Sequence, residues 1–139
     1  MEKESLKNKK IPFKNAKQIA EEAFIWCVKK FGSPIKTKEV PELIVSYERS
    51  SDCYGYYVSA TKEIVVFPFE IPSKTMLVRV LIHEYTHFLQ MPKVRDHSKY
   101  NKLNKMYGYD GNPLEVEAYQ AELKYYRSCY SHLKKMGVV

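Results

Sequence analysis

The sequence predicts an α+β fold in which a small β-sheet is combined with long helices. Two segments, 74–91 and 113–136, repeat apolar residues at helical spacing and have no interior Gly or Pro. Short runs rich in β-branched and aromatic residues fall between positions 42 and 67, a pattern typical of strands. Because the 139 residues show no internal repeat, we expect one domain with a single core over residues 1–139.

Composition narrows the class of protein. With 45% apolar and 28% charged residues, the chain has the balance of an ordinary globular protein. The lysine-rich residues 1–12 are typical of a disordered end, and no signal-peptide or membrane-span pattern follows them. Cys27, Cys53 and Cys129 are odd in number and widely spaced, which indicates reduced thiols rather than a disulfide framework. The sequence therefore predicts a cytoplasmic protein without membrane association.

The net charge of +7 is concentrated towards the two ends of the chain, in residues 3–17 and 124–135. Such an excess attracts nucleic acid or acidic proteins. No nucleic-acid-binding motif accompanies it, so the sequence favours a solvated basic surface, with nucleic acid as the less favoured partner. Nothing in the sequence indicates an oligomeric state.

The first predicted helix begins at Asn15 and ends at Gly32. Asn15 is expected to cap it, with Gln18 three residues later in a capping-box arrangement, and Gly32 fits the position after the last turn. An apolar stripe marks its buried face: Ile19, Ala23, Phe24, Cys27, Val28 and Phe31. This helix is expected to be a packing element.

Three strands are predicted between this helix and the next. They cover residues 42–47, 54–59 and 63–67, each rich in β-branched or aromatic side chains. The link at 60–62 is short enough for a hairpin between the second strand and the third. A small sheet of about three strands is therefore expected before the second helix.

The second helix is predicted to begin after Ser73, which can cap it, and to end before Pro92. Residues 83–87 within it read HEYTH, a match to the pattern HExxH. The helix is apolar on most sides, so the motif is expected to be buried. Unpaired polar side chains are costly in such a place, and a bound metal would satisfy them.

The spacing within HExxH has a chemical meaning. Residues four apart stand on one face of a helix, so His83 and His87 can bind one Zn²⁺ ion together. Glu84 lies about 100° further round the helix, where it can reach a water molecule on the metal but is poorly placed to bind the metal. Two ligands and one base are what metal-assisted peptide hydrolysis requires.

Between Pro92 and the last helix, residues 93–111 are polar, basic and rich in tyrosine, with a short helix expected near 99–106. The last helix is predicted to begin at Asn112-Pro113, with Asn as the cap and Pro at the first helical position. This helix is the expected source of a further metal ligand.

A catalytic zinc site with two histidines is one protein ligand short. The candidates are His97, Glu115, Glu117 and Glu122. Glu117 is favoured because it shares a helical face with small and aromatic residues, where a metal would compensate the burial of a carboxylate. A salt bridge to a lysine is the alternative role for Glu117. Glu115 points about 160° away from it, and Glu115 and Glu122 are expected to face solvent.

HEYTHFLQ followed by NPLEVEAYQAE resembles the zincin metallopeptidases of the glutamate-ligand (gluzincin-like) kind. The resemblance implies a minimal zincin-like metallopeptidase domain with His83 and His87 as ligands, Glu84 as general base, and Glu117 as third ligand before a small residue. It also implies that the strand at 63–68 is the sheet edge that lies along the substrate. Compact relatives of this kind include the ImmA/IrrE-type and SprT-like peptidases.

The chain departs from several family patterns. The metzincin pattern fails at Gln90 and Lys93, which stand where it requires Gly and His. The thermolysin-type aspartate four residues after the third ligand is replaced by Ala121, so no carboxylate is expected there to support a histidine. His97 is similar to the third histidine of the SprT-like proteases, but it follows His87 too closely for their usual loop.

The sequence thus predicts a zinc-dependent peptidase that cuts a protein or peptide substrate through a zinc-bound water activated by Glu84. Tyr107 and Tyr109 are the predicted catalytic partners that stabilise the oxyanion, and Tyr100 and His97 are further candidates. Two alternatives stay open: a non-catalytic, zinc-stabilised binding module, and a SprT-like protease associated with nucleic acid. The substrate and its cleavage specificity are not predicted.

Overall fold

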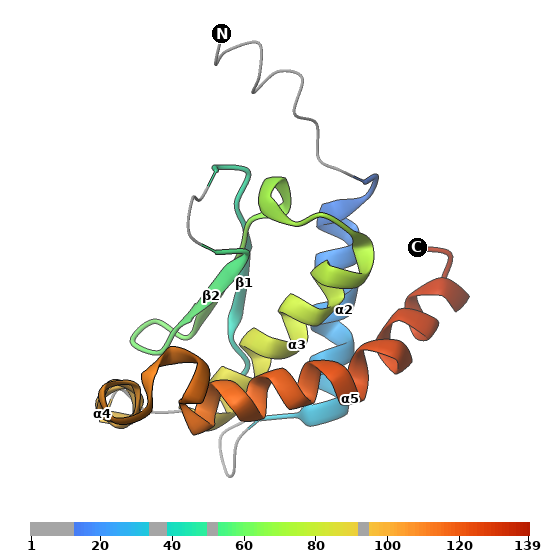
Figure 1. Ribbon diagram of the computed structural model, residues 1–139. Helices are drawn as coiled ribbons and strands as arrows, with labels where there is room; N and C mark the ends of the chain where they lie inside the picture. The colour runs from blue at the N-terminus through green and yellow to red at the C-terminus, as the bar shows by residue number, and fades with distance from the viewer. Residues whose placement is uncertain (1–12, 34–38, 50–52, 92–94) are drawn as a thin grey trace, which may run out of the picture.

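A computed structural model of the chain describes residues 13–33, 39–49, 53–91 and 95–139. The expectation for residues 1–12 lies outside this described part. The fold is α+β, as predicted, with four α-helices and a three-stranded mixed sheet in the described residues (Figure 1). No helix among them combines the length and apolar character that crossing a bilayer would need.

The sheet contains β1 (Glu42–Val45), β2 (Gly55–Val58) and β3 (Glu63–Val66), close to the three predicted strands. The order is β1-β3-β2, with β3 parallel to β1 and antiparallel to β2. The predicted hairpin between β2 and β3 is confirmed. The implied edge position of the strand at 63–68 is wrong, because β3 has a hydrogen-bonded neighbour on each side. In the described sheet, β2 and β1 are the edges.

The central helix is α3 (Lys74–Gln90), which packs against the sheet, α2 (Ala16–Phe31) and α5 (Pro113–Lys135). In Figure 1, α5 crosses α3, and α2 runs beside α3. The core draws fully buried side chains from all of these elements: Ile19, Ala23, Ile64, Val66, Leu77, Leu81, Tyr85 and Leu133. Burial of this apolar surface is the main source of stability.

Local signals set most helix ends. The side chain of Ser73 accepts the backbone N–H three residues later, and that of Asn112 accepts the N–H two residues later, so both predicted caps are confirmed. Gly32 ends α2 with a φ of 69°, which glycine adopts without strain. The capping box at Asn15 is wrong, because its φ of 61° is left-handed whereas a capping residue is extended, and its side chain makes no cap bond.

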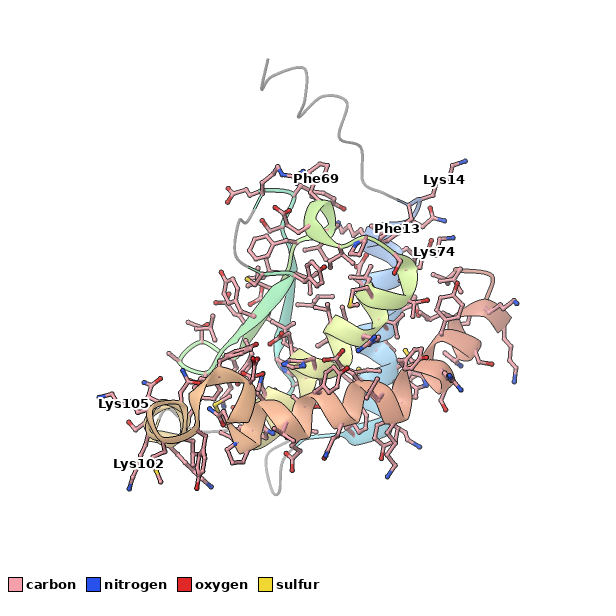
Figure 2. All side chains as sticks on the ribbon, viewed as in Figure 1. Phe13, Lys14, Phe69, Lys74, Lys102 and Lys105 are labelled. Carbon is pink, nitrogen blue, oxygen red and sulfur yellow. The ribbon has the colours of Figure 1, made fainter. Side chains whose placement is uncertain are left out.

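The helix α4 (Arg95–Gly111) is longer than the short helix expected within 93–111. Its course is interrupted at Gly108, whose φ of 75° is not helical, so the last residues turn towards the start of α5. Asn112 ties the two helices together, since its side-chain amide donates to the carbonyl oxygen of Tyr100 at 3.3 Å. Figure 2 shows Lys102 and Lys105 on α4, far from the helix end that carries Lys74.

Candidate metal centre

The two histidines of the HExxH motif face the same point. Because they are one helical turn apart on α3, their rings stack edge to face with centroids 4.9 Å apart. The Nε2 atom of His83 lies 2.8 Å from Oε1 of Glu115, and that of His87 lies 3.1 Å from the same oxygen. The three side chains can offer ligand atoms that all lie within 4.8 Å of one another. They are the candidate metal ligands.

The third member of this group is Glu115 and not the predicted Glu117. Glu115 is buried at 7% exposure, whereas Glu117 is exposed and its carboxylate accepts a hydrogen bond from the side chain of Gln90 at 2.6 Å. The expectation that Glu115 and Glu122 face solvent is wrong for both, since Glu122 is also buried. We therefore replace Glu117 by Glu115 as the candidate third ligand.

The buried face of α5 explains this correction. Its buried residues, Glu115, Ala118, Glu122, Cys129 and Leu133, follow the three- and four-residue spacing of one helical stripe. The sequence favoured Glu117 because that residue shares a helical face with small and aromatic side chains, whereas the buried stripe of the helix runs through Glu115 and Glu122 instead. In the structure both carboxylates have cationic or imidazole partners on α3 that a single-helix view does not include.

Two further side chains support His83 from behind. Its Nδ1 atom lies 2.5 Å from Oε2 of Glu122, and the Nε atom of Arg79 donates to Oε1 of the same carboxylate at 3.0 Å. The sequence prediction did not include this pair. The spacing of these residues was a usable signal. Glu122 follows Glu115 by seven residues and Arg79 precedes His83 by four, and residues at either spacing lie on the same face of a helix.

His87 is supported by an amide instead of a carboxylate. Its Nδ1 atom lies 2.8 Å from Oε1 of Gln90. The amide nitrogen of Gln90 donates to the carbonyl oxygen of Leu114 at 3.0 Å and to Glu117. With that nitrogen engaged by acceptors, the oxygen of Gln90 is the atom that faces the ring, so Nδ1 of His87 carries the hydrogen.

These contacts leave each imidazole with an oxygen acceptor on both sides. A neutral imidazole donates from one nitrogen only, so its second nitrogen would oppose a carboxylate lone pair. Each ring therefore requires another positive centre, either a proton on Nε2 or a metal ion beside Glu115. Two imidazole nitrogens and a carboxylate oxygen are a donor set that zinc accepts, so the residues present fit this metal.

The pKa values follow from the same contacts. Burial would lower the pKa of His83, but hydrogen bonds with Glu115 and Glu122 outweigh it and raise that pKa to about 10. Burial would raise the pKa of Glu115, but hydrogen bonds from the two histidines hold it well below its usual range. The contacts with Glu115 and Glu122 thus favour the protonated form of His83, and a metal ion bound between the histidines and Glu115 would compete with that proton.

Glu84 lies beside this group on α3 and is buried at 8% exposure. Burial raises the pKa of its carboxyl group, while the nearby charges of His83 and His87 oppose that rise. With His83, Glu84 lines a cleft of about 570 Å³. The motif glutamate therefore has access to a cavity in which a substrate could lie.

The four candidates for stabilising the oxyanion all lie on α4, and the structure gives them different environments. Tyr109 lines the cleft with Glu84. Its side chain is 60% exposed overall, but partial desolvation of the hydroxyl group and the charges of Glu115 and Glu84 raise its pKa to about 12. The hydroxyl group of Tyr100 donates to Oε2 of Glu115. Tyr107 is 55% exposed and is not among the residues that line the cleft. The side chain of His97 lies outside the described part of the structure.

No protein-family model, curated protein or solved structure matches this chain. A functional assignment must therefore depend on the geometry of the site.

Proposed function

We propose that this chain is a zinc-dependent, zincin-like metallopeptidase whose metal is held by His83, His87 and Glu115. The observation that carries the proposal is the approach of two Nε2 atoms to one buried carboxylate oxygen, at 2.8 and 3.1 Å, beside a glutamate that faces a cleft. Three protein ligands leave one coordination position open, which distinguishes catalytic from structural zinc sites.

Bound zinc supplies a Lewis acid that polarises the peptide carbonyl and lowers the pKa of water. In the proposed reaction, Glu84 accepts a proton from the attacking water and passes it to the leaving amine. Its place in the cleft, directly after His83 in the chain, favours this role. The contacts of His83 with Glu122 and of His87 with Gln90 hold each ring with Nε2 towards Glu115.

Tyr109 is the tyrosine best placed to assist. Like that of an ordinary tyrosine, its hydroxyl group is protonated at neutral pH, so it can donate a hydrogen bond to the oxygen of a reacting carbonyl. Tyr100 has a different part in the proposal, because its hydroxyl group orients Glu115. The geometry gives no such role to Tyr107.

Glu84→Gln tests the proposed function. We expect the purified protein to contain zinc and to cut members of a random peptide mixture, detected by mass spectrometry. The variant should retain the metal and lose about 10²–10⁴-fold in rate, since a general base contributes that much. Glu42→Gln, the same change at an exposed carboxylate on β1 that does not line the cleft, should keep most of the activity.

Three outcomes would count against the peptidase. Full activity in Glu84→Gln would refute the role of Glu84 as general base. A wild-type protein that contains no metal would refute the assignment of the metal site. Zinc binding with no hydrolysis of any peptide would instead support a non-catalytic module in which the metal joins α3 to α5.

A further inference from the structure

The cleft beside His83 and Glu84 has the size of a ligand site. Its volume is about 570 Å³, within the roughly 300–1,000 Å³ common for small-molecule pockets. Its lining comes from the start of β2, the short 3-10 helix at Pro68–Glu70, one face of α3, the end of α4 and the first half of α5. A group bound here would lie directly beside the proposed reaction centre.

Three tyrosines from separate elements line this one cleft. Tyr54 precedes β2, Tyr109 lies at the end of α4 and Tyr119 lies on α5, with exposed fractions of 40%, 60% and 51%. Met76 and Val80, one turn apart on α3, add an apolar surface. Exposed tyrosines offer large contact area at low entropic cost, which is why binding surfaces are rich in them.

Outside the proposed reaction centre of His83 and Glu84, the charged side chains that line the cleft are already paired within the protein. Arg79 donates to Glu122 at 3.0 Å, and its guanidinium carbon lies 5.8 Å from the ring centroid of Tyr119. Glu70 pairs with Arg49 at 3.0 Å. A charged substrate group would have to displace these partners or remain uncompensated, which is unfavourable.

We propose that this cleft is the subsite for a large apolar side chain, aromatic or long aliphatic, next to the peptide bond that is cut. The inference rests on the proposed peptidase function only in placing this subsite beside a hydrolysed bond. The binding preference itself follows from the lining of the cleft. Binding of such a side chain would bury the exposed faces of the tyrosines together with Met76 and Val80. Charged side chains would gain no comparable contact.

The test measures binding without cleavage, in zinc-loaded Glu84→Gln protein. Fluorescence anisotropy of labelled alanine-based peptides compares Phe, Leu, Ala, Asp and Lys at each position in turn. At one position Phe and Leu should bind roughly tenfold or more tightly than Ala, since apolar pockets discriminate by such factors. Asp and Lys should bind no more tightly than Ala. Preference for Asp or Lys, or no measurable binding of the Phe peptides, would overturn the proposal.

Three tyrosine substitutions test the assignment, and two of them, Tyr119→Phe and Tyr107→Ala, are matched controls. Tyr119→Ala should reduce the Phe-to-Ala ratio towards one, whereas Tyr119→Phe should keep it because the ring remains. Tyr107→Ala removes a tyrosine of similar exposure that does not line the cleft, so the ratio should be unchanged. Equal effects of Tyr107→Ala and Tyr119→Ala would refute the assignment. Thermal unfolding of each variant shows whether the protein remains folded.

Failure of this inference can be distinguished from failure of the peptidase proposal. An apolar preference in the binding assay with no cleavage by the wild-type protein would support the apolar subsite and refute the peptidase function. Cleavage by the wild-type protein with no preference for apolar residues next to the cut bond would support the peptidase function and refute the apolar subsite.

Discussion

The two faces of α3, one fully buried and one partly buried, differ in chemistry. One face packs Leu77, Leu81 and Tyr85, all 0% exposed, into the core. The other directs Arg79, His83 and His87 at carboxylates of α5. Burial of the first face stabilises the fold directly. Partial burial of the second face carries a desolvation cost, which the contacts with the α5 carboxylates oppose, so this face is a weaker source of stability than the first.

The same contrast divides α5 along its length. Its first half brings Glu115 and Glu122 to the histidines, and its second half places Cys129 and Leu133 in the core. Each half therefore faces its own kind of partner. The comparison predicts that substitutions on apolar surfaces change stability, whereas those on the polar surface change metal binding.

The largest stability effect should come from the apolar face of α3. Leu81→Ala removes a fully buried side chain and should cost about 2–5 kcal/mol in the free energy of unfolding. The loss should be similar with metal bound and after chelation, because Leu81 belongs to the core cluster. Urea unfolding in both states measures it. A loss of stability confined to the metal-bound state would contradict the claim that the apolar face stabilises the fold independently of the metal.

On the polar face, Glu122→Gln should weaken zinc binding by about 10–100-fold, the usual effect of removing a group that supports a metal-ligating histidine. The amide can still accept from Nδ1 of His83, but it carries no charge to raise the basicity of the ring. Competition with a chromophoric chelator gives the affinity, with Glu70→Gln as the matched control. Equal affinities for Glu122→Gln and wild type would show that Glu122 serves packing alone.

The cap of α5 joins the two regions and should have an intermediate effect. Asn112→Ala removes the side-chain acceptor for the N–H of Leu114 and should lower stability by about 0.5–2 kcal/mol. Because Glu115 lies in the first turn of this helix, zinc affinity should fall as well. Thermal unfolding and the chelator assay report the two effects. Unchanged values in both would show that the helix start is fixed by other contacts.

The smallest perturbation uses the cysteines as reporters. Cys53 lines the cleft and is exposed, so it should react promptly with a thiol reagent. Burial raises the pKa of Cys129 to about 12 and that of Cys27 well above its ordinary value, so both thiols should stay protonated and react only on unfolding. Counting modified thiols over time checks this. Prompt modification of all three would contradict the burial of the core pair.

Local features of the sequence predicted the parts of the site that depend on local geometry. The spacing of His83 and His87 defines a shared helical face, and Ser73 and Asn112 act as caps through neighbouring backbone groups. The position of β3 depends on long-range pairing, so its central place was not predictable from its residues. The choice of Glu115 depends on packing between α3 and α5, which provides partners for carboxylates that appear costly in isolation.

The central claim is that Glu115 completes the metal site, and two matched variants test it most directly. Glu115→Gln and Glu117→Gln make the same chemical change two residues apart on α5. Zinc content after dialysis, measured by inductively coupled plasma mass spectrometry, should approach one ion per chain in wild type and Glu117→Gln and fall strongly in Glu115→Gln. Loss of zinc in Glu117→Gln with retention in Glu115→Gln, or a wild-type protein without bound metal, would contradict it.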